Sequence, residues 1–370
     1  MARRDDIPSL TGARGVAACS VLFGHALDAS FYYQPMLHPF AARFAYFGMS
    51  LFFVLSGFVI HYNYADLFRS EPLKTAISRF FVARFARLYP LYAVAILCSI
   101  PLIPVPFPGW IMISYLTMTQ SWFNVEYAIF PPTWSISTEW FFYVAFIPLT
   151  MVVVRLGKPV AVFVALSIAA IGGLSLAFGL WRIPITAFTA DWFWHGNKVS
   201  GDPWEWSNYL APYLRVLDFV SGMLMAQAYR MRAGQLPSVI LPAGLLWICI
   251  VGLASLTPWA PLENLVPNFL YVLAIAPMML HVCVHKSWLS HALSSPGMLF
   301  LGEISYSIYI WSFFVIIMLG NMFTGAIPIT LHYFASALRV VAICGLTIVV
   351  AYGSYTFIEA PARRFIRRQR

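Results

Sequence analysis

Apolar residues recur along the chain in runs of about 20, each long enough to cross a bilayer as a helix. Short segments that carry most of the charge separate these runs. The pattern predicts an all-α, polytopic integral membrane protein, with residues 1–370 as a single transmembrane domain. About ten spans are expected, near 10–30, 44–64, 88–106, 134–155, 159–180, 208–230, 238–256, 264–284, 299–319 and 333–358.

The stretch 109–122 is apolar but short, which favours a re-entrant or interfacial segment over an eleventh span. The charge pattern agrees. With ten spans and a cytoplasmic N-terminus, 17 of the 23 Lys and Arg residues lie inside, 3 outside and 3 within spans. Because cytoplasmic loops carry an excess of Lys and Arg, both termini are expected in the cytoplasm. An eleventh span would place the basic C-terminus outside.

Composition excludes an ordinary soluble protein. The chain is 61% hydrophobic and 10% charged, whereas soluble domains are about 45–50% apolar and about 25% charged. The net charge of +9 is therefore attributed to the cytoplasmic bias of basic residues, with no nucleic-acid partner expected. The five cysteines lie in apolar segments without a C-x-x-C pair, so neither a disulfide nor a metal site is expected.

The first span carries two costly ionisable residues, Arg14 and His25. Eleven helical steps return to within about 20° of the start, so both side chains are expected on one face, about 16 Å apart along the axis. Arg14 would lie near the cytoplasmic entry and His25 toward the outer half. The structural alternatives are an arginine that snorkels to the headgroups and a histidine that bonds a neighbouring helix.

A basic stretch, 77–90, interleaves Arg79, Arg84 and Arg87 with phenylalanines. If helical, it is expected on the inner membrane face with its aromatic rings in the interface. It would then serve either as an anchor to anionic lipids or as a clamp for a phosphorylated donor, since arginine forks match phosphate oxygens.

Glu139 is expected about one turn into the membrane from the outer side. It could orient His25, position an acceptor hydroxyl, or pair with Arg215. Arg215 is also spaced to pair with Asp218, three residues on. The Trp-rich loop 181–207 has two interpretations, an aromatic belt or a lid over an acceptor site.

In chain order, these motifs resemble the acyltransferase-3 family of membrane acyltransferases, which includes bacterial enzymes that O-acetylate polysaccharides and nodulation factors and others that acylate macrolides. The resemblance covers nearly the whole chain. The motifs are Arg14 and His25 (Arg-x10-His), Phe52–Phe58 (FFxLSGF), Arg84 and Arg87 with Pro90 (RxxR), Trp134, Ser135 and Glu139 with Tyr143 (WSLxxE), Arg215 with Gly222, Ser305 with Tyr306, and Glu359 with Pro361.

The chain departs from the family pattern at two places. The family often has Gly-Val-Asp before the FF pair, where this chain has Gly48-Met49-Ser50. Family members commonly have a histidine soon after the SYxxYL element, where Trp311-Ser312 stands here. Roles taken over from the family are therefore not assigned at these positions.

The resemblance implies a single transmembrane acyltransferase domain that takes an acyl group from cytoplasmic acyl-CoA, with acetyl-CoA expected, to a hydroxyl of a glycan or glycosylated small molecule. Acyl-CoA is a co-substrate, and no bound cofactor is expected. The expected catalytic residues are Arg14, His25 and Glu139; those that bind the donor are Arg79, Arg84 and Arg87; those that bind substrate are Trp134, Ser135, Tyr143, Arg215, Ser305 and Tyr306.

Under this hypothesis His25 is the general base, and a covalent acyl-histidine relay stays open. The expected location is a bacterial cytoplasmic membrane. Two other functions stay open: a transporter or flippase for a glycan or lipid-linked precursor, and a non-catalytic partner of a glycan assembly complex. The acceptor, the acyl chain length and the oligomeric state do not follow from the sequence.

Overall fold

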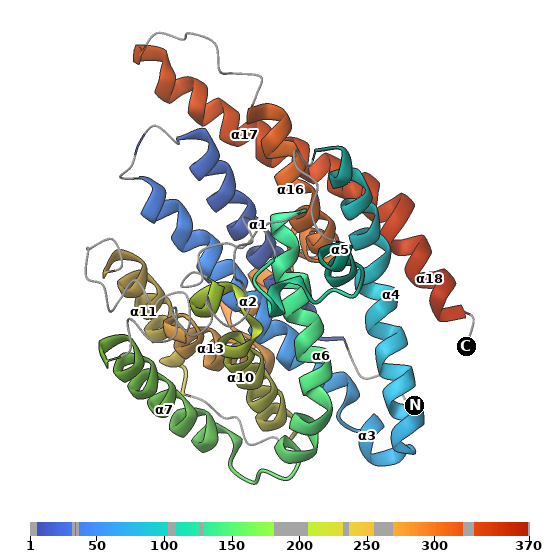
Figure 1. Ribbon diagram of the computed structural model, residues 1–370. Helices are drawn as coiled ribbons and strands as arrows, with labels where there is room; N and C mark the ends of the chain where they lie inside the picture. Colours follow the sequence, from blue (N-terminus) through green and yellow to red (C-terminus); the bar gives the residue numbers. More distant parts are fainter. Residues whose placement is uncertain are drawn as a thin grey trace.

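The computed structural model describes residues 6–31, 34, 37–102, 109–125, 129–180, 206–231, 237–254, 269–320 and 329–368. In these ranges the elements are helices and no strand occurs (Figure 1). The longer helices are α1 (Pro8–Ser30), α2 (Leu37–Tyr64), α4 (Leu73–Ser99), α6 (Trp134–Val153), α7 (Pro159–Leu180), α10 (Pro212–Arg230), α11 (Ile240–Ala254), α13 (Val272–Val284), α16 (Ser305–Gly320) and α17 (Ile329–Ser354). The shorter ones are α3 (Leu67–Ser70), α5 (Gly109–Leu116), α14 (Trp288–Leu293), α15 (Pro296–Glu303) and α18 (Ala360–Arg368).

The all-α class is confirmed, and every expected span contains a helix. Among the described residues, five helical segments are long and apolar enough to cross a membrane: Pro8–Ser30, Leu37–Ser70, Leu73–Leu102, Pro131–Val153 and Tyr333–Ile366. The chain is therefore a multi-pass membrane protein. Three further apolar helices are shorter: Pro159–Gly173, Ile240–Ala254 and Val272–Val284.

Three elements differ from the expected spans. The span expected at 88–106 begins much earlier, as α4, at Leu73. The span expected at 299–319 is broken, because α15 and α16 meet at an angle of 68°. Residues 109–122 form only the eight-residue α5 and a short 3₁₀ turn, Gln120–Trp122, which is too short to span.

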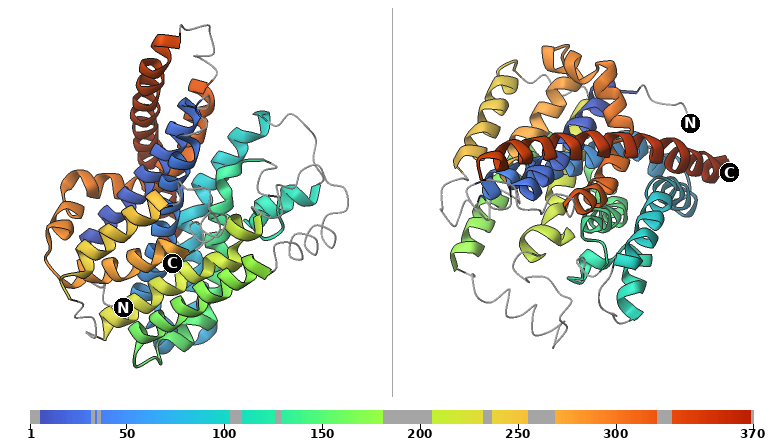
Figure 2. Two further views of the ribbon diagram at one scale, coloured as in Figure 1. Left: turned by 90° about the vertical axis from the view of Figure 1, so that its left-hand side faces the viewer. Right: turned by 90° about the horizontal axis from the view of Figure 1, so that it is seen from above.

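The helix α2 lies at the centre of the bundle, between α1 and α10 (Figures 1 and 2). Its contact with α10 depends on two glycines. A Cβ atom on Gly57 would lie 1.9 Å from the Phe219 carbonyl oxygen, and one on Gly222 would lie 2.0 Å from the Val54 carbonyl oxygen. The two backbones therefore touch, as small residues permit in membrane helix pairs.

The outer surface of the bundle carries many large apolar side chains. Leu97 on α4, Ile168 on α7 and Phe334 on α17 are each about two-thirds exposed or more, at 66%, 69% and 71%. α17 extends past the neighbouring helices at one end (Figure 2). Apolar exposure on this scale fits contact with lipid, which solvates such side chains as well as a protein core does.

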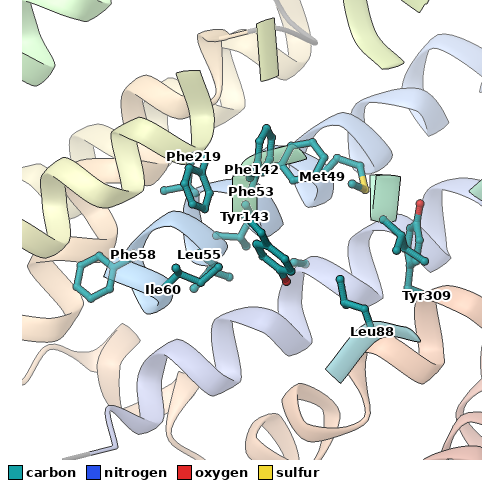
Figure 3. Close-up of a cluster of buried hydrophobic side chains, with 14 of the residues drawn as sticks. Met49, Phe53, Leu55, Phe58, Ile60, Leu88, Phe142, Tyr143, Phe219 and Tyr309 are labelled. Carbon is teal, nitrogen blue, oxygen red and sulfur yellow. The ribbon is translucent and has the colours of Figure 1, made fainter. Parts of the chain in front are cut away.

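Aromatic rings fill the space between α2, α6 and α10 (Figure 3). The ring of Phe142 lies 5.1 Å from that of Phe53 and 5.0 Å from that of Phe219. Met49 and Tyr309 lie at one edge of this cluster, where it gives way to cavities.

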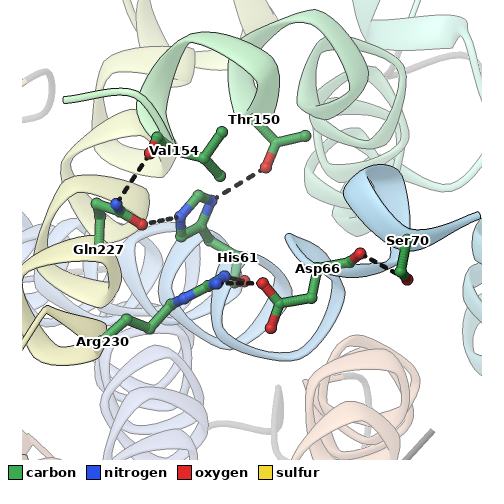
Figure 4. A network of polar contacts seen from close by, with 7 residues as sticks. All are labelled: His61, Asp66, Ser70, Thr150, Val154, Gln227 and Arg230. Carbon is green, nitrogen blue, oxygen red and sulfur yellow. Dashed lines mark hydrogen bonds and ion pairs between the residues drawn. The ribbon is translucent and has the colours of Figure 1, made fainter.

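At one end of α2 a polar network joins the same three helices (Figure 4). The fully buried His61 ring contacts Gln227 Oε1 at 3.1 Å and Thr150 Oγ1 at 3.3 Å. Beside it, Arg230 forms an ion pair with Asp66. This network and the glycine contact hold α2 in place, and α2 supplies one wall of the candidate site.

Candidate active site

A cavity of about 150 Å³, the arginine cavity, lies between α1, α2, α4, α6 and α16. Its charged residues are three arginines and one carboxylate. The lining is Arg14, Met49, Phe52, Phe53, Leu55, Ser56, Val59, Ile60, Arg84, Arg87, Leu88, Ser135, Ile136, Glu139, Ser305, Tyr306 and Tyr309. Seven of the expected site residues therefore line one cavity.

A second cavity of about 390 Å³, the histidine cavity, lies further along α1 and α2. Its lining contains two histidines, one aspartate and several aromatic rings. The lining is Val21, Gly24, His25, Asp28, Ala29, His38, Ala41, Ala42, Ala45, Tyr46, Met49, Pro131, Pro132, Trp134, Tyr209, Leu210, Tyr309, Phe313 and Ile316. Met49 and Tyr309 line both cavities, so the two adjoin there.

Arg14 enters the arginine cavity from α1. Its guanidinium donates to Ser305 Oγ at 3.1 Å, and Ser305 in turn donates to the Gly302 carbonyl oxygen at 2.8 Å. Ser305 is the first residue of α16, at the break that follows α15. The break therefore holds the Arg14 guanidinium at the wall of the arginine cavity.

Arg84 is 8% exposed and lies inside the bundle. Its guanidinium donates to the Tyr64 hydroxyl at 2.8 Å and lies 4.8 Å from the centre of that ring, within cation–π range. Phe80, one turn earlier, is fully buried. The basic stretch 77–90 is thus part of a continuous helix with Arg84 facing inward, which differs from the surface helix expected.

Arg79 lies outside the arginine cavity. Its side chain is 48% exposed and forms an ion pair with Glu71, which lies between α3 and α4. Helical spacing explains the difference, since five residues separate Arg79 from Arg84 and place the two side chains on different faces. The structure therefore brings Arg84 and Arg87 to the cavity but not Arg79.

Glu139 lines the arginine cavity, not the histidine cavity. Its Oε1 atom accepts from Ser56 Oγ at 2.9 Å and from the Tyr143 hydroxyl at 2.6 Å. Tyr143 thus acts as a support for the carboxylate. A contact with His25, one of the three roles considered for Glu139, is not formed in this structure.

Arg215 is fully buried and lines neither cavity. It pairs with Asp218 at 3.0 Å and donates to Ser50 Oγ at 3.3 Å. Its guanidinium lies 5.0 Å from the centre of the Phe53 ring. The pairing with Asp218 confirms the partner that the three-residue spacing predicted. The contacts with Ser50 and Phe53 tie α10 to α2.

Comparison with known proteins decides the family. Residues 7–356 match the family model described as an acyltransferase domain, that of acyltransferase family 3. The chain belongs to the acyltransferase-3 family. No solved structure matches it significantly.

This acyltransferase is similar to three curated proteins of different length. It is 27% identical to acyltransferase MdmB of Streptomyces mycarofaciens over 391 aligned positions, covering 98% of this chain and 93% of MdmB. It is 24% identical to the peptidoglycan O-acetyltransferase OatA of Listeria monocytogenes, covering 98% of this chain and 56% of OatA. A putative O-acetyltransferase of Staphylococcus aureus is 36% identical over 83 residues, 22% of this chain and 12% of its own.

The remaining expected site residues of this acyltransferase divide between the two cavities. Trp134 lines the histidine cavity, whereas Ser135 and Tyr306 line the arginine cavity. Ser135 Oγ donates to the Tyr309 hydroxyl at 2.8 Å, and Tyr306 donates to the Leu88 carbonyl oxygen at 2.8 Å. Of the Trp-rich loop, residues 181–205 lie outside the described residues. Trp206 is buried and donates to the Ser121 carbonyl oxygen at 2.6 Å.

Sequence reasoning missed four residues of the site: Met49, Tyr309, Asp28 and His38. Asp28 could have been found from the sequence, because it follows His25 by three residues and shares its helical face. His38 belongs to the next helix, and no spacing rule relates it to α1. Tyr309 is 174 residues away in sequence from Ser135, its hydrogen-bond partner, so no local pattern relates the two.

Proposed function

We propose that this acyltransferase moves an acyl group from a CoA thioester in the arginine cavity to an acceptor hydroxyl in the histidine cavity. The observation that carries the proposal is the shared wall at Met49 and Tyr309, with Arg14 on one side and His25 on the other. A thioester at the junction would have a cation on one side of it and a base on the other.

The arginine cavity suits the donor by charge. In the described part of the lining, Arg14, Arg84 and Arg87 face the cavity with one carboxylate, that of Glu139. Arginine forks match phosphate oxygens in two-point contacts, and CoA is rich in phosphate. At about 150 Å³ the cavity is smaller than the roughly 300–1,000 Å³ of a typical ligand pocket. It would therefore enclose only part of CoA, with the thioester toward Met49 and Tyr309, the phosphates against Arg84 and Arg87, and the adenosine outside. Acetyl is the expected acyl group.

In the proposed reaction, His25 takes the proton of the acceptor hydroxyl as its oxygen attacks the thioester carbonyl. The new C–O bond forms, the C–S bond breaks, and the proton passes from His25 to the CoA sulfur. Arg14 stabilises the negative charge that develops on the carbonyl oxygen. General base catalysis of this kind is typically worth about 10²–10⁴ in rate.

The acceptor class is inferred from the histidine cavity and from the relatives. Three aromatic rings, Tyr46, Trp134 and Tyr209, line this cavity and offer flat apolar faces with polar edges. Such faces suit a sugar ring, and OatA is named for an acetylated glycan. A hydroxyl of a glycan or a glycosylated small molecule is the proposed acceptor.

The proposed setting is a bacterial cytoplasmic membrane with both termini inside. The positions of the Lys and Arg residues support this orientation. The donor would then enter from the cytosol and the acceptor from the other side. A transporter or flippase is not favoured, because the family match is to an acyltransferase domain.

The test uses membrane vesicles from the host strain, which contain its own acceptors, with acetyl-CoA labelled in the acetyl group. Vesicles that carry the protein should move label from CoA to non-CoA material, and His25→Ala should abolish this transfer at equal protein level. The exposed His291, outside both cavities, supplies a matched control in His291→Ala. Label that stays on CoA would contradict the enzyme, and full activity of His25→Ala would contradict the mechanism.

A further inference from the structure

Asp28 and His38 form a pair that the mechanism above does not use. The two side chains come from α1 and α2, and Asp28 Oδ1 lies 2.5 Å from His38 Nδ1. Both line the histidine cavity. An ionised carboxylate can only accept in such a contact, so His38 Nδ1 then carries the hydrogen.

The position of Asp28 relates it to His25. It follows His25 by three residues on α1, which places both side chains on one helical face, and both line the same cavity. Among the described residues of that lining, Asp28 is the only acid. The other carboxylate of the site, Glu139, is held in the arginine cavity by Ser56 and Tyr143.

A contribution to folding does not explain this pair. The His38 and Asp28 side chains are 71% and 44% exposed, and exposed ion pairs contribute little to stability. The proton transfer proposed for His25 explains the pair of Asp28 and His38 better. When His25 takes a proton, a positive charge forms in a cavity lined mainly by apolar and aromatic side chains, and Asp28 is the anion there.

We propose that Asp28 is a positioning residue for His25, and that His38 holds its carboxylate in place. This inference rests on the proposed function. The negative charge orients the imidazole and stabilises its protonated form between the breaking of the acceptor O–H bond and the delivery of that proton to the CoA sulfur. Asp28 takes no proton itself, so the balance of the reaction is unchanged.

The test measures two reactions of vesicles containing each variant: acetyl transfer to vesicle material, and hydrolysis of acetyl-CoA, in which water is the acceptor. Asp28→Asn should lower the maximal rate of both reactions by about 10–100-fold, a smaller decrease than that expected for His25→Ala. The apparent KM for acetyl-CoA should stay the same, because the donor occupies the other cavity. His38→Ala should lower both rates less, and Asp28→Glu should restore most of the activity.

The controls separate this inference from the proposed function. Asp6→Asn removes an exposed acid outside both cavities and should behave as the parent protein. If His25→Ala is inactive while Asp28→Asn keeps the parental rates, the positioning role is overturned and the general base stands. If Asp28→Asn lowers transfer but leaves hydrolysis unchanged, Asp28 binds the acceptor instead, which also overturns the inference. Full activity of His25→Ala would remove the proposed function and this inference together.

Discussion

Met49 on α2 and Tyr309 on α16 each line both the arginine cavity and the histidine cavity. The two side chains thus mark the place where the two cavities adjoin, between Arg14 and His25. The junction combines a flexible thioether with a tyrosine whose hydroxyl is fixed by two hydrogen bonds. Met49 is therefore the more adjustable half of the junction.

Enlarging Met49 should block acyl transfer. Met49→Trp would fill the junction, and we expect transfer to fall by at least about tenfold while acetyl-CoA still binds, because the donor arginines are untouched. Met49→Ala should widen the junction, so that longer acyl groups from propionyl-CoA or butyryl-CoA are also transferred. Rates with the three thioesters in vesicles measure both effects, and equal selectivity in the parent and the alanine variant would contradict this role.

Removing the Tyr309 hydroxyl should destabilise the junction. The Tyr309 hydroxyl accepts from Ser135 Oγ and donates to the Pro132 carbonyl oxygen at 2.6 Å. All three residues are buried. Tyr309→Phe leaves both partners without this hydroxyl, at a cost of about 1–3 kcal/mol. Thermal unfolding in detergent measures the loss. Tyr333→Phe, at an exposed tyrosine, is the comparison, and an equal melting temperature for both variants would argue against a structural role of the Tyr309 hydroxyl.

The three arginines of α4 should differ in their effect on donor use. Arg84→Ala and Arg87→Ala are each expected to raise the apparent KM for acetyl-CoA by about tenfold, the loss of one charge-assisted contact. Arg79→Ala should change it less than about twofold, since an exposed ion pair contributes little. A series of acetyl-CoA concentrations with each variant measures this. The same KM shift in all three would mean that only net charge matters.

A side chain at Gly57 should separate α2 from α10. The Cβ atom of Gly57→Val would lie 1.9 Å from a backbone oxygen, which cannot move without the whole helix. We expect a loss of about 1–3 kcal/mol or failure to fold. Gly345→Ala is the control, because nothing lies within 4 Å of its Cβ position. Yield after detergent extraction and thermal unfolding compare the two, and a normal Gly57→Val protein would show that the helices pack differently.

Local patterns predicted much of this protein for physical reasons. Long apolar runs fix helices in a membrane, because no other open structure satisfies the backbone there. Helical periodicity also related Arg14 to His25, which line adjoining cavities. Helical periodicity could not show whether Arg79 or Arg84 faces the cavity, because the face of α4 that turns inward depends on the helices packed against it. The span expected at 88–106 was placed after the charged residues of 77–90, because hydropathy excludes such residues from a membrane core.

The sequence patterns did not predict the contacts between side chains of different helices. The pair of Asp28 and His38 depends on how α1 and α2 pack, and the place of Tyr309 depends on the 68° angle between α15 and α16. Glu139 was given three possible partners, and the structure gives it two others, Ser56 and Tyr143. Side chains that lie close through tertiary packing leave no spacing signal.

The angle between α15 and α16 also changes the electrostatics of the donor side. Because α16 begins at Ser305, its first turn lies at the arginine cavity, and both Ser305 and Tyr306 line that cavity. The opening amides of any α-helix have no partners within the helix and carry a partial positive charge. Because α15 ends at Glu303 and its last carbonyls carry the opposite partial charge, the break brings a positive and a negative helix end together beside the guanidinium groups.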